Sequence, residues 1–184
     1  MIAPNISETL TKIIPLLDST GIEYWLARGV LRNLYLRGVT GGSNSDLDFH
    51  IWEKDSKIVE EKLLPIFMSD HPNLVTERKD YKLAFYTPLE KDRHDFFVEF
   101  VFTNIDSDDS RFAYHARADG KRYANAECFS HLRHMYIEHG GHLIRIPALP
   151  NEYLLGTYGP EWAKNLMKSK AFKSTPEFLL QQQG

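Results

Sequence analysis

Apolar residues along the chain recur with two different periods, one typical of helices and one typical of strands. Helical spacing predicts helices at residues 7–19, 30–35 and 55–68. Alternating or continuous apolar runs predict strands at residues 22–27, 46–52, 74–78, 81–86 and 96–103. The run FFVEFVFT, residues 96–103, is the most apolar in the chain and is therefore expected in the centre of a sheet.

The second half of the chain has weaker patterns. The acidic residues 106–109 predict a solvated loop, and residues 123–139 fit either a strand followed by a helix or one irregular segment. A short strand is expected at 143–146, after two glycines, and helices are expected at 151–155 and 161–168. Together these elements predict a mixed α/β domain with about four to six strands.

Length and composition indicate one domain of ordinary size. The 184 residues are 42% hydrophobic and 26% charged, which is typical of a globular protein. A formal net charge of -3 argues against a dedicated nucleic-acid binder, because such proteins need a basic surplus. Cys128 is the only cysteine, so no intramolecular disulfide is expected. Without a leader-type N-terminus or an apolar run of about 20 residues, the chain is expected to be cytoplasmic and to have no membrane span.

Two aspartates in the predicted strand 46–52 are the first candidates for chemistry. Asp46 and Asp48 are two residues apart, which places both carboxylates on the same face of a strand. Leu47 and Phe49 would then point the other way, into the core. Two neighbouring carboxylates repel each other unless a proton or a cation lies between them, and carboxylate oxygens are the ligands that Mg²⁺ or Mn²⁺ prefers.

Glu99 is the expected third acid. It is the lone charge in FFVEFVFT, and a charged side chain in so apolar a strand is costly unless it faces a cleft or a metal ion. Asp95, at the start of that strand, is the weaker candidate. Three carboxylates around divalent cations suit phosphoryl or nucleotidyl transfer, because the cations activate the attacking hydroxyl and balance the charge on the leaving phosphate. Asp46, Asp48 and Glu99 are therefore the predicted catalytic and metal-binding residues.

A candidate phosphate-binding segment precedes these acids. Arg28 and Gly29 stand between a predicted strand and a predicted helix, where a helix N-terminus offers N–H donors and partial positive charge. Arg32 and Arg37 follow on that helix and could bind a phosphate bidentately, and Ser45 ends the glycine-rich loop before the aspartates. A lone Asp-x-Asp or Arg-Gly is common on protein surfaces, so the order of all these elements is the more specific signal.

This ordered set resembles a known signature. The segment YWLARGVLRNLYLRGVTGGSNSDLDFHIW, residues 24–52, is similar to that of the nucleotidyltransferase superfamily, which has the DNA-polymerase-β-like fold. Within that superfamily it most resembles the LicD/fukutin-type transferases. Residues 144–162, which contain IRIP, NEYL, Tyr-Gly and Trp162, resemble the tail of the same family. The matches span roughly residues 22–165.

The resemblance implies a nucleotidyltransferase fold, with a mixed central sheet and flanking helices, as a single domain over residues 1–184. Its core would occupy about residues 20–105 and its family-specific tail about 140–165. The implied activity is Mg²⁺-dependent transfer of a phosphate-linked group, such as phosphocholine or ribitol phosphate, from a CDP-activated donor to a glycan hydroxyl.

By position, the resemblance gives Asp46 and Asp48 the metal-ligand role and Glu99 the third acidic position. Arg28 stands where the first glycine of the usual pair is expected, and residues 43–45 replace the extra acids that often precede the aspartates. Two alternatives stay open. One is a small antibiotic-type nucleotidyltransferase that uses ATP or another nucleoside triphosphate, and the other is a non-catalytic relative that only binds a nucleotide.

Four histidines cluster in HLRHMYIEHGGH, namely His131, His134, His139 and His142. A zinc site is one interpretation, but spacing alone supports it weakly, and a mixed polar surface is the more ordinary expectation. Cys128, just before the cluster, is expected to be a small buried apolar residue rather than a nucleophile.

Overall fold

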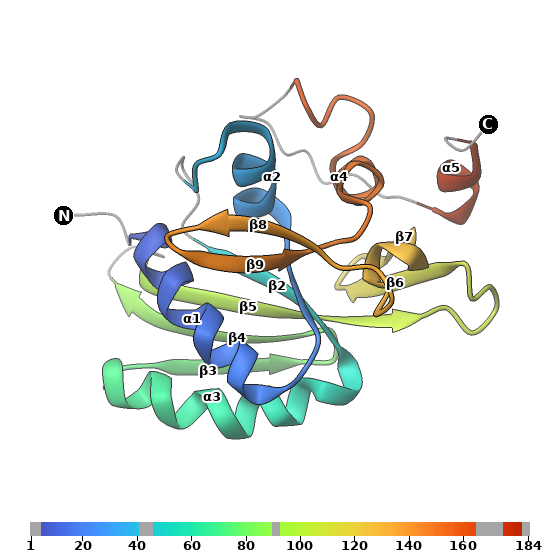
Figure 1. Ribbon diagram of the computed structural model, residues 1–184. Coiled ribbons are helices and arrows are strands. Elements are labelled where there is room, and N and C mark those ends of the chain that lie inside the picture. The colour runs from blue at the N-terminus through green and yellow to red at the C-terminus, as the bar shows by residue number, and fades with distance from the viewer. Residues whose placement is uncertain (1–4, 41–45, 90–92, 165–174, 182–184) are drawn as a thin grey trace.

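The computed structural model describes residues 5–40, 46–89, 93–164 and 175–181 (Figure 1). The helices are α1 (Ile6–Thr20), α2 (Arg28–Arg37), α3 (Ser56–Asp70), α4 (Pro150–Tyr158) and α5 (Pro176–Gln181), with the short 3-10 helices η1 (Glu53–Asp55) and η2 (Ala126–Phe129). The strands are β1 (Tyr24–Leu26), β2 (Leu47–Trp52), β3 (Val75–Lys79), β4 (Lys82–Leu89), β5 (Arg93–Ile105), β6 (Phe112–Arg117), β7 (Gly120–Asn125), β8 (Met135–His139) and β9 (His142–Ile146).

Seven strands form one mixed sheet. Their order is β1-β2-β5-β4-β3, with β6 paired to the end of β5 and β7 paired to β6. β2 and β5 are parallel, and the other paired neighbours are antiparallel. The apolar run on β5 pairs with β2 on one side and β4 on the other, so its predicted central position is confirmed. With helices around this sheet, the predicted mixed α+β architecture is confirmed as well.

Local sequence explains how α1 forms and where it docks. The Asn5 side chain accepts a hydrogen bond from the Glu8 N–H at its start, and Gly21, at φ 75°, ends it. The residues that share its apolar face are at most 1% exposed: Leu10, Ile13, Ile14 and Leu17. Burial of each such side chain contributes about 1.5–3 kcal/mol. This face packs α1 against α3 and β9.

The C-terminal half of the chain folds back on the N-terminal half. β8 and β9 form a separate two-stranded sheet, and β9 packs on β1 and α1. α4 packs on both α2 and β7. Figure 1 shows α2 and α4 together at one end of the molecule, with α3 at the other. The fold thus brings the C-terminal tail motif next to the predicted phosphate-binding helix.

The number of strands differs from the prediction. The described residues contain nine strands instead of about four to six, because 112–125 and 135–146 form two hairpins. Within residues 123–139 the structure has the end of β7, then η2 and β8, and the four residues of η2 are the only helical ones. Neither face of β8 is fully buried. A hairpin strand without a buried face lacks the apolar alternation on which the prediction depended.

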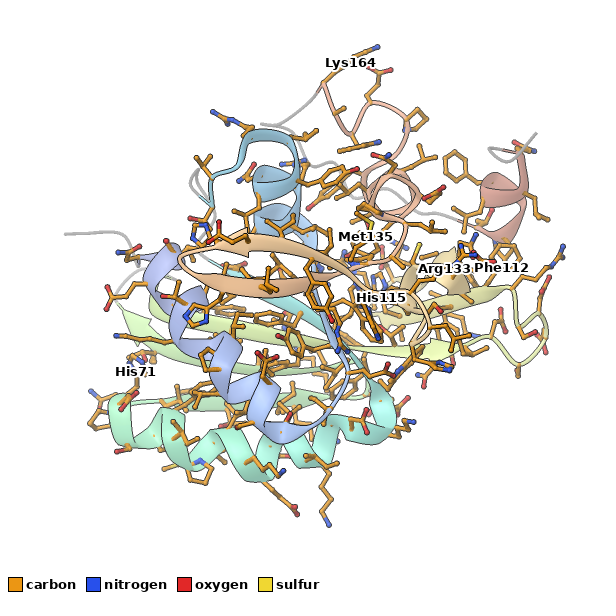
Figure 2. All side chains as sticks on the ribbon, viewed as in Figure 1. His71, Phe112, His115, Arg133, Met135 and Lys164 are labelled. Atoms are coloured by element: carbon orange, nitrogen blue, oxygen red, sulfur yellow. The ribbon has the colours of Figure 1, made fainter. Side chains whose placement is uncertain are left out.

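The helix expected at 161–168 is also not found in its described part, since residues 161–164 form turns. α4 ends at Tyr158 and is capped by Gly159, which has φ 80°, and Pro160 follows. Proline has no N–H to continue a helical ladder, so the chain turns away there. Figure 2 shows Lys164 at the outer end of this segment, away from the sheet. Among the described helices, none has the length and apolar character that a membrane span needs.

Candidate active site

Asp48 on β2 and Glu99 on β5, here called the acid pair, lie side by side. The two parallel strands pair in the register that sets Asp48 opposite Glu99, and each residue is 7% exposed. Leu47 and Phe49, on either side of Asp48, are fully buried, and Phe49 stacks on Phe100 with ring centroids 5.7 Å apart. Strand alternation therefore places both acids on one face of the sheet and these apolar side chains on the other.

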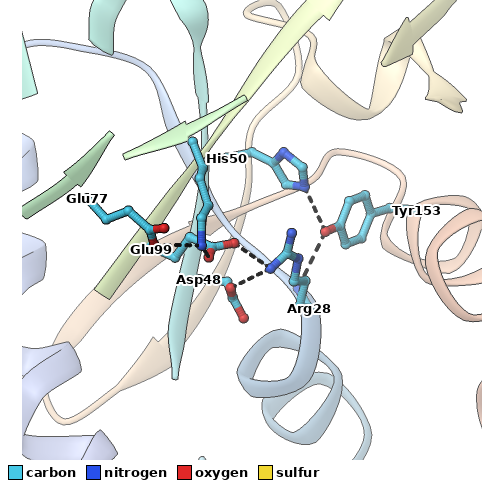
Figure 3. A network of polar contacts seen from close by, with 7 residues as sticks. Arg28, Asp48, His50, Glu77, Glu99 and Tyr153 are labelled. Carbon is cyan, nitrogen blue, oxygen red and sulfur yellow. Dashed lines mark hydrogen bonds and ion pairs between the residues drawn. The ribbon is translucent and has the colours of Figure 1, made fainter. Parts of the chain in front are cut away.

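One guanidinium group bridges the acid pair (Figure 3). Nη1 of Arg28 donates to Oδ1 of Asp48 at 2.8 Å and to Oε1 of Glu99 at 2.7 Å. Arg28 is the first residue of α2 and has φ 51°, and it is the only non-glycine residue with positive φ in the described ranges. The turn that connects β1 to α2 thus aims a cation at two acids on the neighbouring strands.

Lys82, at the start of β4, is a second cation on the acid pair. Its Nζ donates to Oε2 of Glu99 at 2.8 Å and lies 3.5 Å from Oε2 of Glu77. Glu77 is also paired with Lys79. Sequence reasoning missed Lys82, because a lysine that opens a hairpin strand is usually solvated and carries no signal of this role.

The two acids differ in how strongly they hold a proton. Burial raises the pKa of Asp48 to about 6, and the charge of Arg28 offsets only part of this effect. Burial also acts to raise the pKa of Glu99, but Arg28 and Lys82 outweigh it, so the pKa of Glu99 is lowered. Glu99 is therefore ionised at neutral pH, whereas Asp48 titrates close to neutral pH.

The other predicted site residues lie at different distances from the acid pair. Asp46 is exposed and directly precedes β2, near enough for its charge to raise the pKa of Asp48. Arg32, 5% exposed, lies over the Tyr158 ring at 4.4 Å. The structure does not bring Arg37 to the acid pair: it is exposed at the far end of α2, about 14 Å along the helix axis from Arg28.

The structure describes less of three further residues that the sequence predicted at this site. Gly29 is the second residue of α2, next to Arg28, as the sequence places it. Ser45 and its neighbours 43 and 44 lie outside the described residues. The side chain of Asp95 also lies outside the described part, so its rank behind Glu99 stays a prediction.

A buried hydrogen-bond network connects α4 to the start of α2. The ring of His50, which is fully buried on β2, bonds Oγ1 of Thr103 through Nδ1 at 2.7 Å and the Tyr153 hydroxyl through Nε2 at 2.9 Å. The same hydroxyl accepts the backbone N–H of Arg28 at 3.4 Å (Figure 3). Burial and the charge of Arg28 lower the pKa of His50 to about 3. His50 is therefore neutral and serves this network as donor at one nitrogen and acceptor at the other.

The β6–β7 hairpin adds positive charge that sequence reasoning did not find. His115 on β6 stands opposite Arg122 on β7, and its ring centroid is 5.2 Å from that of His50. Burial lowers the pKa of His115 well below its usual range, and the charges of Arg28, Arg117 and Arg122 act in the same direction. These arginines are about 90 residues from Arg28 in sequence, so no local motif joins them to it.

Comparison with known proteins identifies the fold that carries the acid pair. No protein-family model matches the sequence, and no curated protein matches it. The solved structure of the lincosamide antibiotic adenylyltransferase LnuA with bound lincomycin is similar, with a TM-score of 0.51 and 15% identity over 89% of this chain and 97% of that one. The antibiotic-resistance factor ANT(2'')-Ia is similar with a TM-score of 0.52 and 12% identity, over 77% of this chain and 64% of that one.

The chain has the nucleotidyltransferase fold. At 12–15% identity the likeness shows the fold alone. Neither similar structure is described as a transferase with a CDP-linked donor, so the resemblance to the LicD/fukutin-type transferases remains a prediction.

Nucleotidyltransferase folds generally use divalent metal ions, and the chemistry of the acid pair fits one. Asp48 and Glu99 offer carboxylate oxygens, with Asp46 as the third candidate ligand. The Arg28 guanidinium is a stand-in cation, since it marks a point between Oδ1 of Asp48 and Oε1 of Glu99 where positive charge is bound. In the described residues no three His, Cys, Asp or Glu side chains are placed together to hold a metal ion. The pair thus fits a divalent ion only after Arg28 moves.

The histidine cluster gives no support for a zinc site. It belongs to the described residues, in which no metal-binding group of three side chains occurs. His139 instead shares a hydrogen bond with the Ser7 hydroxyl at 2.8 Å, and His134 lies beside Tyr136. Cys128 is a buried free thiol, as expected, and burial raises its pKa.

Proposed function

We propose that this chain transfers a nucleotidyl group from a nucleoside triphosphate to a hydroxyl group of a small molecule. The observation that supports this most is the acid pair, in which carboxylates from adjacent parallel strands meet a cation at the first turn of α2. One structural neighbour is an antibiotic adenylyltransferase and the other an antibiotic-resistance factor. Those descriptions favour a small-molecule acceptor over a glycan.

In the proposed reaction the acceptor oxygen forms a bond to the α-phosphorus, the bond from that phosphorus to the oxygen bridging it to the β-phosphorus breaks, and pyrophosphate leaves. The hydroxyl proton goes to a carboxylate, and Asp48 suits this role because burial raises its pKa to about 6, near neutral pH. Arg28 and the N–H groups at the start of α2 would bind phosphate oxygens. A divalent ion held by the acid pair and Asp46 would activate the hydroxyl and balance charge on the leaving group.

A second candidate is transfer from a CDP-activated donor to a glycan hydroxyl. The tail of the chain favours it, because its aromatic residues pack on α2 next to the acid pair. Tyr153 bonds the Arg28 N–H, Tyr158 covers Arg32, and the Trp162 ring lies 6.4 Å from that of Tyr35. These are the residues that carry the resemblance to the LicD/fukutin-type tail.

The test is a thermal-shift screen of the full chain, followed by product detection. ATP, CTP, GTP, UTP, CDP-choline and CDP-ribitol are each added with and without Mg²⁺ or Mn²⁺. Ligands that raise the melting temperature are then incubated with lincomycin, other antibiotic hydroxyl acceptors or glycans, and products are found by mass spectrometry. Nucleotidylated acceptor with pyrophosphate release supports the proposal, turnover of a CDP-linked donor supports the second candidate, and binding without turnover supports a non-catalytic relative.

Asp48→Asn separates chemistry from folding in this assay. The change keeps the side-chain shape and removes the charge, so turnover should fall more than about a hundredfold while the far-UV spectrum stays unchanged. Asp109→Asn is the matched control, because Asp109 lies in the loop after β5 and pairs with Arg111. Turnover that survives Asp48→Asn would show that the acid pair does not carry the reaction.

A further inference from the structure

We infer that Arg28 is the resident cation of the acid pair, and that its guanidinium and a divalent metal ion compete for Asp48 and Glu99. In the free protein the acids bind Arg28, and the pair becomes available to a metal ion only when that side chain leaves. This inference deepens the proposed function, because it concerns the same two carboxylates, but its test measures metal binding and not turnover.

The geometry of the bridge explains the competition. A single nitrogen, Nη1 of Arg28, is within 2.8 Å of one oxygen of Asp48 and within 2.7 Å of one oxygen of Glu99. A metal ion bound to the pair through these two oxygens would take the position that the guanidinium nitrogen occupies. The other Glu99 oxygen bonds Lys82 at 2.8 Å, so it is also taken. Guanidinium and metal ion cannot both occupy this point.

The charges of the buried site are already balanced. Arg28 and Lys82 carry two positive charges, and Asp48 and Glu99 carry two negative charges. Glu77, next to Lys82, is paired with Lys79 as well. A divalent ion added to this set would introduce two uncompensated charges between residues that are 7% exposed. Removal of the Arg28 charge reverses this condition, because it leaves the acid pair short of a cation.

The backbone of Arg28 shows that its position is held by these contacts. At φ 51° a residue with a β-carbon is in the left-handed region, which persists only where surrounding contacts hold it. The two carboxylates and the Tyr153 hydroxyl are the contacts that do so. Glycine would adopt this conformation without strain and would leave the carboxylates open.

Arg28 also has a route out of the acid pair. Its side chain is 21% exposed, whereas those of Asp48 and Glu99 are 10% and 9% exposed. A guanidinium binds phosphate oxygens bidentately as readily as carboxylates. Under the proposed function, a triphosphate at the start of α2 would draw Arg28 away and so free the acids.

Direct measurement of Mn²⁺ binding tests the inference. Full-length protein, freed of metal with a chelator, is titrated with Mn²⁺ at neutral pH while free Mn²⁺ is followed by electron paramagnetic resonance. Arg28→Gln and Arg28→Gly should bind Mn²⁺ at least about tenfold more tightly than the unchanged protein. Arg28→Lys keeps the positive charge, so the logarithm of its Mn²⁺ affinity should rise by less than half as much as in the neutral variants. The matched control, Arg133→Gln, removes a charge from an exposed arginine and should leave the affinity unchanged.

The site of binding is checked with a double variant. Arg28→Gln combined with Asp48→Asn should lose the gain, because one of the two carboxylates is gone. Should both neutral Arg28 variants fail to fold, nuclear magnetic resonance of the unchanged protein decides. The amide signals of residues 47–49 and 98–100 should then stay sharp at Mn²⁺ concentrations that saturate a free carboxylate pair.

Equal affinity of the unchanged protein and Arg28→Gln, or broadening of those amide signals in the unchanged protein, would overturn the inference. The two proposals fail separately. If no substrate is turned over but the Arg28 variants gain Mn²⁺ affinity, the proposed function fails and the inference stands. If turnover is found and the affinities are equal, the inference fails and the proposed function stands.

Discussion

Replacing Tyr153 with phenylalanine removes one oxygen atom that joins α4 to both β2 and α2. The hydroxyl bonds Nε2 of His50 at 2.9 Å and accepts the N–H of Arg28 at 3.4 Å. The aromatic ring itself would remain, with its centroid 6.1 Å from that of Phe129 and 5.4 Å from that of His50. The change therefore isolates the hydrogen bonds from the packing of a residue that is 1% exposed.

The expected loss follows from what the missing oxygen leaves behind. His50 is fully buried, and without Tyr153 its Nε2 has no partner in the network described above. A buried polar group without a partner costs about 1–3 kcal/mol, and the longer bond from Arg28 adds little. We expect the free energy of unfolding to fall by about 2 kcal/mol. For a chain of 184 residues, this corresponds to a melting temperature lower by about 4–8 °C.

Urea unfolding followed by circular dichroism measures this loss, with Tyr136→Phe as the control. Tyr136 is 44% exposed, so its change should stay within about 0.5 kcal/mol. Thr103→Val removes the other partner of His50, and the double variant should deviate from additivity by at least about 0.5 kcal/mol, since both changes act through one ring. A Tyr153→Phe protein within 0.5 kcal/mol of the parent, with additive effects, would refute the network.

Three further predictions can be tested, each with its own measurement. Burial lowers the pKa of His115, so the unfolded chain binds more protons than the folded one below pH 6.5. The free energy of unfolding should therefore fall between pH 7 and 5, by at most about 1.4 kcal/mol per pH unit for this group, and it should fall less in His115→Gln. Cys128, whose pKa burial raises, should react with a thiol reagent only after urea unfolds the chain. Gly140→Ala should cost about 1–3 kcal/mol more than Gly141→Ala in thermal melts, because its β-carbon would lie 2.5 Å from Thr11, whereas nothing lies within 4 Å at Gly141.

How much of the architecture could be predicted depends on burial. Helix α1 and strands β2 and β5 have one buried face or are buried along most of their length, so their apolar spacing appears in the sequence. α1 and β5 are examples, with predicted limits of 7–19 and 96–103 against Ile6–Thr20 and Arg93–Ile105 in the structure. The β8–β9 hairpin was predicted only in part, as the strand at 143–146 that corresponds to β9 (His142–Ile146), because β8 has no fully buried face. Its existence depends on packing against β1 and α1, which no local pattern expresses.

The candidate site also combines features that a local pattern predicts with features that only the tertiary structure shows. The two-residue spacing of Asp46 and Asp48 and the lone charge of Glu99 could be recognised because strand alternation is a local property. The cation that these acids hold is not local. Arg28 reaches them through a left-handed turn, and Lys82 reaches Glu99 from the opposite neighbouring strand. The sequence predicts Arg28 as a phosphate ligand and gives no signal for Lys82.

The sequence by itself thus indicated most elements of the N-terminal half, the face of β2 that carries Asp48, and the candidate acids, because each depends on residues a few positions apart. Tertiary structure alone decided the pairing of β2 with β5, which sets Asp48 opposite Glu99, and the return of α4 to the start of α2. It also decided that the charge between the acids comes from the chain itself. Such contacts join residues 20 to 125 positions apart, and their energies depend on burial and distance that arise only when the whole chain has folded.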